Sequence, residues 1–309
     1  TNKIQLLSSD YLIYRCIGLP FYLLNMHSTA VLRGLKYAKI TLYSAIIVSI
    51  SNVVFSLFFG LFLGYGASGI GFASSVAFLI ASIYSVTVLK KQQNHLNVSY
   101  EDVDKANMRK KFFSVGSYIV IRSLFLTLFF AYIRNRAALM SMDEIALQHI
   151  LLQLWSVGYI FVDAVAIAAQ TLIAELISKK EKYQNSLLQK ELISVTTIIS
   201  LILSVIPLIF LESFIEIFTG DRFDLFVDFR LKVMVSISLL IGCFAFLWDG
   251  VLLGLDKSKE FSLLSILSAT AGFLICSYLL MYQNTIEILW VSINVSLAVR
   301  AVLGYLYQK

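Results

Sequence analysis

Long apolar runs separated by short polar turns make up most of the chain. Nine runs predict membrane spans, because a helix of each length crosses about 30 Å of hydrocarbon at about 1.5 Å per residue. None alternates with the period of two that is typical of a membrane β-strand. The pattern predicts an all-α, polytopic membrane helical bundle. The predicted spans are 11–33, 40–63, 67–89, 112–133, 145–177, 192–211, 231–255, 261–282 and 286–307.

The first predicted span contains a helix breaker. It carries the sequence Gly18-Leu19-Pro20, and a proline inside an apolar span kinks the helix and frees a carbonyl group that needs another partner. The residues at 8–10, Ser-Ser-Asp, are good N-cap residues, so we expect the helix to begin there.

One short segment occurs twice. Residues 30–44, AVLRGLKYAKITLYS, and residues 250–264, GVLLGLDKSKEFSLL, each close an apolar run, make a short turn and open another run. A repeat at so long a spacing indicates two similar lobes. The first half of the second lobe has no counterpart within the sequence. We therefore expect this chain to be the carboxy-terminal part of a larger two-lobe protein.

The polar, Lys-rich residues 90–111 separate three predicted spans from the six that follow. We interpret this stretch as the boundary between the lobes. The expected domains are the remainder of the amino-terminal lobe, a cytoplasmic linker and the carboxy-terminal lobe, at 1–95, 96–111 and 112–309.

Basic residues predict the orientation. With the turn at 33–39 in the cytoplasm, most Lys and Arg residues fall on the cytoplasmic side. This places Arg15 outside, leaves only Arg122 and Arg300 inside the membrane and puts the carboxy terminus in the cytoplasm. We expect a multi-pass protein of the plasma (inner) membrane. Three further spans before residue 1 would complete a six-plus-six plan.

Composition supports this class and argues against others. Hydrophobic residues make up 59% and charged residues 14% of the chain, against about 45–50% and about 25% in soluble domains. The net charge of +6 fits basic cytoplasmic loops and does not require nucleic acid. Cys16, Cys243 and Cys276 all lie in apolar runs, so we interpret them as small buried hydrophobic residues. Without a nucleophile–base arrangement, a metal-ligand spacing or a phosphate loop, we expect no enzyme and no cofactor.

Several short motifs follow one another along the chain in a familiar order. They are GLP at 18–20, LRGL at 32–35, Asn52, FVDAVAIAAQ at 161–170, WDGVLLG at 248–254, and LW at 289–290 followed by Arg300. Together they resemble the fourth to twelfth helices of the multidrug and toxic compound extrusion (MATE) transporters, in their DNA-damage-inducible (DinF-like) branch. The resemblance implies a two-lobe transporter fold that lacks its first three helices. It also implies export of amphipathic or cationic small molecules in exchange for protons or sodium, by rocking of the lobes.

Asp163 is the first candidate for a binding role. A charge at a helix centre costs about 2.5–3.5 kcal/mol on insertion scales, so ionisable residues in a span usually face the bundle interior. At helical spacing Asp163 shares a stripe with Gln148, Trp155, Tyr159 and Gln170. A carboxylate beside aromatic faces suits a cavity for amphipathic cations. The alternative is a structural aspartate that pairs with a neighbouring helix.

Arg122 lies too deep in its predicted span to reach the headgroups, so it predicts a carboxylate partner. Asp163, on the next predicted helix, is the nearest candidate, and pairing would favour a structural role for both. Asp249 is a further candidate for substrate or ion binding, with helix capping or loop anchoring as the alternative. For Arg300 and Asn52 we expect packing or interhelical hydrogen bonds.

The expected partners are the lipid bilayer, a small-molecule substrate and a coupling cation, H⁺ or Na⁺, and we expect the complete protein to be monomeric. Two other interpretations remain open. A flippase for lipid-linked oligosaccharides has a similar architecture and predicts a strongly basic cavity. A membrane fragment that does not transport, such as an assembly partner, is the third.

Overall fold

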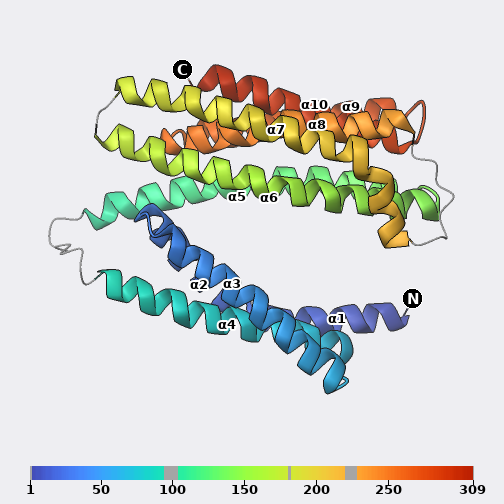
Figure 1. Cartoon of the computed structure of the whole chain (residues 1–309), viewed down its shortest axis with the longest axis horizontal. Coiled ribbons are helices and arrows are strands. Elements are labelled where there is room, and N and C mark those ends of the chain that lie inside the picture. Colours follow the sequence, from blue (N-terminus) through green and yellow to red (C-terminus); the bar gives the residue numbers. More distant parts are fainter. Residues whose placement is uncertain (1, 94–103, 180–181, 220–227, 309) are drawn as a thin grey trace. The chain divides into compact units, whose positions relative to one another are not determined.

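The computed structural model describes residues 2–93, 104–179, 182–219 and 228–308. Apart from short turns and the segments that join them, these ranges are helical, and no strand occurs in them. The chain divides into two compact units, Thr1–Val103 and Asp104–Lys309. Each unit has its own set of long apolar helices (Figure 1).

The first unit is built around its last helix. Its elements are α1 (Asn2–Ile17), α2 (Leu19–Gly34), α3 (Ala38–Phe55), the π-helical segment η1 (Ser56–Phe62) and α4 (Gly66–Gln93). α1, α2, α3 and η1 all pack against α4. The expected N-cap at 8–10 is wrong, because α1 begins at Asn2. The preceding residues KIQLL are good helix formers and extend the helix backwards.

The predicted break in the first span occurs at Gly18, between α1 and α2. The Gly18 N–H donates to the Arg15 carbonyl at 3.1 Å, so the Tyr14 carbonyl loses its usual helical partner. The Ser75 hydroxyl of α4 donates to that carbonyl at 2.6 Å instead. A Cβ atom at Gly18 would lie 2.6 Å from Ser75 Oγ, so this close approach requires glycine.

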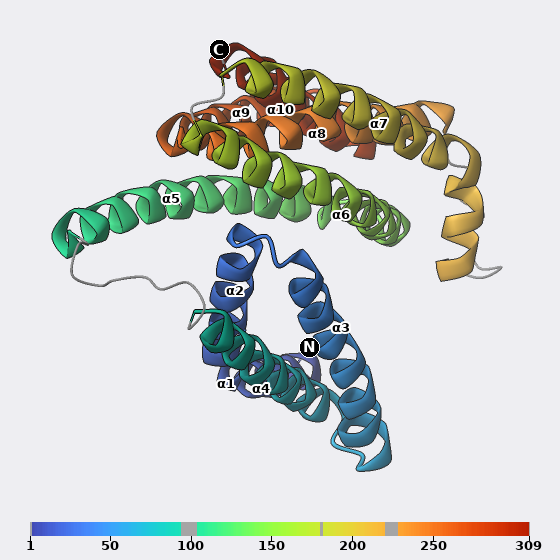
Figure 2. The same cartoon turned by 60° about the vertical axis from the view of Figure 1, so that its left-hand side comes forward.

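The second unit contains six helices within the described ranges. They are α5 (Lys105–Ala137), α6 (Met142–Ser178), α7 (Lys182–Thr219), α8 (Phe229–Gly254), α9 (Ser258–Leu279) and α10 (Ile286–Tyr307). α8 packs against α6, α7 and α10, and α9 packs against α5 and α10. Pro207 lies inside α7, and the end of α7 bends away from the rest of that helix (Figure 2). Trp290 of α10 lies fully buried in the largest hydrophobic core.

Side-chain caps fix where several helices begin. The Asp104 carboxylate accepts from the backbone N–H groups of Ala106 and Asn107, both at 3.1 Å, so α5 begins at Lys105. Residues 105–111, which we expected in the linker, are therefore helical. Of the rest of the expected linker, residues 96–103 lie outside the described ranges. Ser141 and Glu144 form a reciprocal capping box at the start of α6.

Eight of the described helices are long and apolar enough to cross a membrane, by length and composition. They account for the predicted spans from 40–63 onwards. The remaining predicted span, 11–33, is built from α1 and α2, which are 16 residues each and too short to qualify separately. The prediction of an all-helical polytopic membrane protein is confirmed.

The repeated segment forms the same turn in both units. Lys36 and Asp256, at matching positions, have φ values of 66° and 59°, and within the described part of the chain they are the non-glycine residues with positive φ. The next residues, Tyr37 and Lys257, donate their N–H groups to the carbonyls of Leu32 and Leu252 at 2.8 and 2.9 Å. The repeat is therefore one of backbone conformation as well as of sequence.

The cysteines do not all share one environment. Cys243 and Cys276 are buried, as expected. Cys16 is exposed on the surface of α1, so the expectation of a buried side chain is wrong there.

Candidate functional site

Ionised side chains from three helices meet inside the second unit. Arg122 of α5 donates through Nη2 to Oδ2 of Asp249, on α8, at 3.1 Å. Arg300 of α10 donates through Nε to Oδ1 of the same carboxylate at 3.1 Å, and its Nη2 contacts Oδ2. We call Arg122, Asp249 and Arg300 the ion cluster. It corrects the expected pairing of Arg122 with Asp163, and it gives Asp249 a place at the centre of a bundle instead of a capping role.

Neighbouring side chains hold the ion cluster in position. The hydroxyl of Ser265 accepts from Arg122 Nε at 2.8 Å, and the Arg122 guanidinium lies over the ring of Phe261 at 4.2 Å. The Arg300 guanidinium lies 4.8 Å from the ring of Phe246. Flat guanidinium groups stack well on aromatic rings, and this compensates part of their lost hydration.

The ion cluster is buried and carries more positive than negative charge. The side chain of Arg300 is 6% exposed, that of Asp249 12% and that of Arg122 17%. Removing one member of a buried pair leaves an uncompensated charge, which typically costs about 3–5 kcal/mol. Because two guanidinium groups share one carboxylate, the cluster has an excess positive charge.

The predicted stripe on α6 divides between the interior and the surface. Gln148 and Tyr159 are buried, with 2% and 7% exposure, whereas Asp163 and Gln170 are exposed on the surface of the second unit. At about 100° per residue, Asp163 lies about 60° around the helix from Gln148, which is enough to move it off the buried face. Asp163 has no hydrogen bond or ion pair with any described residue. It does interact electrostatically with both arginines of the ion cluster.

The buried part of the stripe belongs to an aromatic group. The Trp155 ring lies 4.0 Å from Tyr159, 5.6 Å from Phe130 and 6.5 Å from Trp290, centroid to centroid. The Trp290 indole donates to Gln148 Oε1 at 2.9 Å. This fixes the orientation of the amide, since an indole N–H can only donate. Gln148 Nε2 and Trp155 Nε1 are left buried without a hydrogen-bond partner among the described residues.

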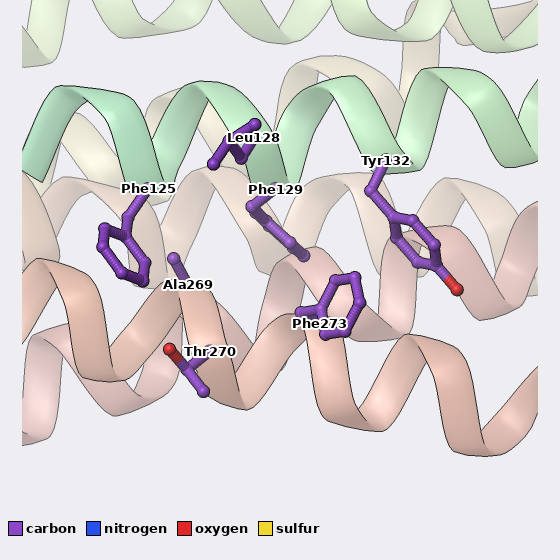
Figure 3. A pocket seen from close by; sticks show the side chains of 7 residues that line it. All are labelled: Phe125, Leu128, Phe129, Tyr132, Ala269, Thr270 and Phe273. Carbon is purple, nitrogen blue, oxygen red and sulfur yellow. The ribbon is translucent and has the colours of Figure 1, made fainter.

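Two of the cavities in the described part of the chain lie between α5 and another helix. The first is an apolar groove of about 480 Å³ between α5 and α9, with side chains from both helices facing it (Figure 3). Its lining residues are Phe125, Leu128, Phe129, Tyr132, Ala269, Thr270 and Phe273. The second, of about 380 Å³, lies between α5 and α6, and we call it the α5–α6 pocket. Its lining residues are Phe130, Arg134, His149, Leu152, Gln153, Trp155 and Ser156.

The first unit contains a polar network of its own. Arg15 donates to Tyr11 Oη at 2.9 Å and to Ser74 Oγ at 3.1 Å, and Asn52 Nδ2 donates to the same Ser74 oxygen at 3.4 Å. Ser56 donates to Asn52 Oδ1 at 3.0 Å. The interhelical hydrogen bond expected for Asn52 is confirmed. Ser74 thus joins Arg15 to Asn52, which lies within the span candidate Ala38–Phe62.

Metal binding finds no support in the described ranges, where no group of three or more His, Cys, Asp or Glu side chains gathers. The chemistry that the described side chains offer is charge pairing, hydrogen bonding and aromatic contact. Long apolar helices that enclose such groups define a polytopic membrane protein with a polar interior.

Comparison with known proteins shows what the chain is similar to. Residues 1–58 match the MatE family model. Protein DETOXIFICATION 44, chloroplastic, from Arabidopsis thaliana is 25% identical over 307 residues, which are 98% of this chain and 57% of that protein. DNA damage-inducible protein F from Escherichia coli (strain K12) is 24% identical over 294 residues, 94% of this chain and 63% of that protein. The chain is thus similar to these two proteins over nearly its whole length, and to the MatE family model over its first 58 residues.

Two further matches bear on architecture and on function. The solved outward-facing conformation of a multidrug resistance MATE family transporter of the MOP superfamily has a TM-score of 0.84 at 16% identity, over 97% of this chain and 68% of that one. The fold is therefore that of MATE transporters. Lipid II flippase MurJ from Thermosipho africanus (strain TCF52B) is 34% identical over 90 residues, 29% of this chain and 18% of that protein. The chain spans a little over half the length of the plant relatives that it matches.

Proposed function

We propose that the complete protein is a secondary active efflux transporter. It exports amphipathic or cationic small molecules in exchange for protons or sodium, by rocking of two helical lobes. The relation to MATE transporters in sequence and fold supports the class. The ion cluster is the observation that carries the proposal, because three ionised groups buried among apolar helices are costly for a protein whose only task is to fold.

Asp163 is the residue that we assign to the transport cycle, as the carboxylate for the coupling ion or for a cationic group of the substrate. It lies on an exposed face of α6, within electrostatic range of Arg122 and Arg300. A carboxylate without a bonded partner can take up a cation at little structural cost. Binding of that cation changes the field on the ion cluster, and such coupling must be reciprocal between the two sites.

Tyr159, Trp155 and Gln170 remain candidates for contact with substrate. Trp155 lines the α5–α6 pocket, and Gln170 is exposed on α6, seven residues beyond Asp163. Tyr159 is buried, and its hydroxyl donates to the Ser238 carbonyl at 3.5 Å, which favours a supporting role behind Trp155.

The test is export of a cationic dye by cells that make the complete protein, normalised to the amount of protein in the membrane. We expect Asp163→Asn to lower the normalised rate while surface expression persists. Asp143→Asn is the matched control, because it makes the same change on the same helix in its first turn. An undiminished normalised rate for Asp163→Asn would remove this residue from the mechanism. Imposed proton and sodium gradients, applied separately in vesicles, identify the coupling ion.

The location belongs to the same proposal. We place the protein in the plasma (inner) membrane as a monomer, with the carboxy terminus in the cytoplasm. The basic residues of the turns support this orientation. A reporter that is active only in the cytoplasm, fused after Lys309, should be active, and loss of that activity would reverse the orientation.

A second candidate is a flippase for lipid-linked oligosaccharides. Two observations favour it: the 90-residue match to a lipid II flippase, and the excess positive charge of the ion cluster. Guanidinium groups bind phosphate well. A flippase predicts competition by a lipid pyrophosphate and no export of a cationic dye, so the dye assay separates the two functions.

A further inference from the structure

The α5–α6 pocket combines an apolar wall with a polar wall. Phe130, Leu152 and the Trp155 ring supply apolar surface, and Arg134, His149 and Gln153 supply polar groups. The volume of about 380 Å³ is that of a small-molecule site. No acidic side chain is among the lining residues.

The polar groups of this pocket are mainly donors. Arg134, in the last turn of α5, has N–H groups and no acceptor, and its side chain has no hydrogen bond or ion pair within the described part of the chain. The Ser156 hydroxyl donates to the Gln153 backbone carbonyl at 2.8 Å and lies 3.2 Å from Gln153 Oε1. Gln153 is exposed, and its amide NH₂ group supplies two further donors.

Trp155 adds an aromatic face to the pocket. The ring is held by Tyr159 at 4.0 Å and Phe130 at 5.6 Å, so its orientation is fixed. Its indole nitrogen is buried under neighbouring atoms, so Trp155 offers a ligand its ring and not its N–H.

We propose that the α5–α6 pocket binds an amphipathic molecule that joins an apolar ring system to an anionic group. The rings pack against Phe130 and Trp155. The anionic group, a carboxylate or a phosphate, accepts hydrogen bonds from Arg134 and Gln153. The claim that this ligand is a transported substrate rests on the proposed function. The claim that it binds in the pocket does not.

Binding is measured directly on the purified 309-residue chain in phosphatidylcholine nanodiscs, without any gradient. The probes are 1-naphthoate and 1-naphthylmethylammonium, which share a ring system and differ in charge. We expect saturable calorimetric binding of 1-naphthoate and binding at least about tenfold weaker for the ammonium compound, because anions gain from cationic donors. Equal binding of the two probes, or no binding of 1-naphthoate, overturns the proposal.

Variants test where 1-naphthoate binds. Arg134→Gln should weaken its binding about tenfold, as expected for loss of a hydrogen bond to a charged group. Trp155→Ala should also weaken it about tenfold, through loss of the apolar wall. Arg136→Gln is the matched control, since it removes the same charge from the same helical turn but does not line the pocket. Equal affinity in Arg134→Gln, Trp155→Ala and the control would overturn the location.

A charge reversal guards against a variant that fails to fold. Gln153 is exposed, so Gln153→Glu should fold, and it places a carboxylate in the pocket. It should weaken binding of 1-naphthoate and strengthen binding of the ammonium probe, and an unchanged preference for the anion contradicts the proposal.

Nanodiscs that contain phosphatidylglycerol distinguish the source of the ligand. Competition with 1-naphthoate assigns the site to an anionic lipid, and undiminished binding assigns it to a soluble amphipathic anion.

Discussion

The indole N–H of Trp290 donates to the side-chain oxygen of Gln148 at 2.9 Å, and this bond joins α10 to α6 inside the core. We expect Trp290→Phe to destabilise the second unit by about 1–3 kcal/mol, because it leaves the buried Gln148 oxygen without a donor. Adding Gln148→Leu to that variant should recover part of the loss, since both polar groups are then gone. Thermal unfolding in detergent measures both, and a double variant no more stable than Trp290→Phe would contradict this account.

The ion cluster predicts an unequal response to removal of its members. Asp249→Asn leaves two buried guanidinium groups without a counter-charge, and we expect a loss of about 3–5 kcal/mol, seen as a sharp fall in membrane yield. Arg122→Ala leaves the pair of Asp249 and Arg300 intact and should cost less.

Combining Arg122→Ala with Asp163→Asn distinguishes the observed pairing from the one that the sequence indicated. Because Arg122 contacts Asp249 and not Asp163, the double variant should be no more stable than Arg122→Ala alone. A double variant that is more stable than Arg122→Ala would show that Arg122 pairs with Asp163 after all. Unfolding temperature and yield are the measurements.

Much of the fold could be predicted, because hydropathy depends only on neighbours along the chain. The span boundaries follow from apolar runs, and the break at Gly18 follows from Gly18-Leu19-Pro20. The partner of Arg122 could not be predicted in this way. Asp249 is 127 positions away, and which helices touch is decided by packing. One clue was available: two deep arginines needed carboxylates, and Asp163 and Asp249 were the candidates within the spans.

The face of α6 on which Asp163 lies is a second feature that could not be predicted from the sequence. Five residues with roughly helical spacing look like one stripe in a sequence, but a deviation of about 60° separates a buried position from an exposed one. Nor did the sequence indicate the hydrogen bond from Arg15 to Ser74, on α4, which lies 59 positions away.

The stability of the first unit should be sensitive to any side chain at position 18. Gly18→Ala should lower the stability of the first unit, because the new Cβ would lie 2.6 Å from Ser75 Oγ and 2.7 Å from the Ser75 Cα. Gly116→Ala, on α5, is the control: a Cβ there meets nothing within 4 Å, so alanine should be neutral or stabilising by up to about 1 kcal/mol. Unfolding temperature measures both, and equal effects would show that the junction tolerates a side chain.

The repeated turn predicts a stabilising change. Asp256 has a φ of 59°, a conformation that costs most L-residues about 1 kcal/mol or more and glycine little. Asp256→Gly should therefore raise stability although it removes the exposed ion pair with Lys111, which contributes little. Asp256→Val should lower stability. A lower unfolding temperature for Asp256→Gly would show that the ion pair with Lys111 contributes more to stability than the relief of backbone strain does.

The ion cluster also has a consequence for biosynthesis. The ribosome delivers its members in the order Arg122, Asp249, Arg300, on α5, α8 and α10. Arg122 enters the membrane before its bonded partner Asp249, which arrives only with α8. A nascent chain that ends after α9 holds the pair of Arg122 and Asp249, and α10 then adds a second cation that shares the same carboxylate. Insertion of α10 is thus the step that gives the second unit its positive interior.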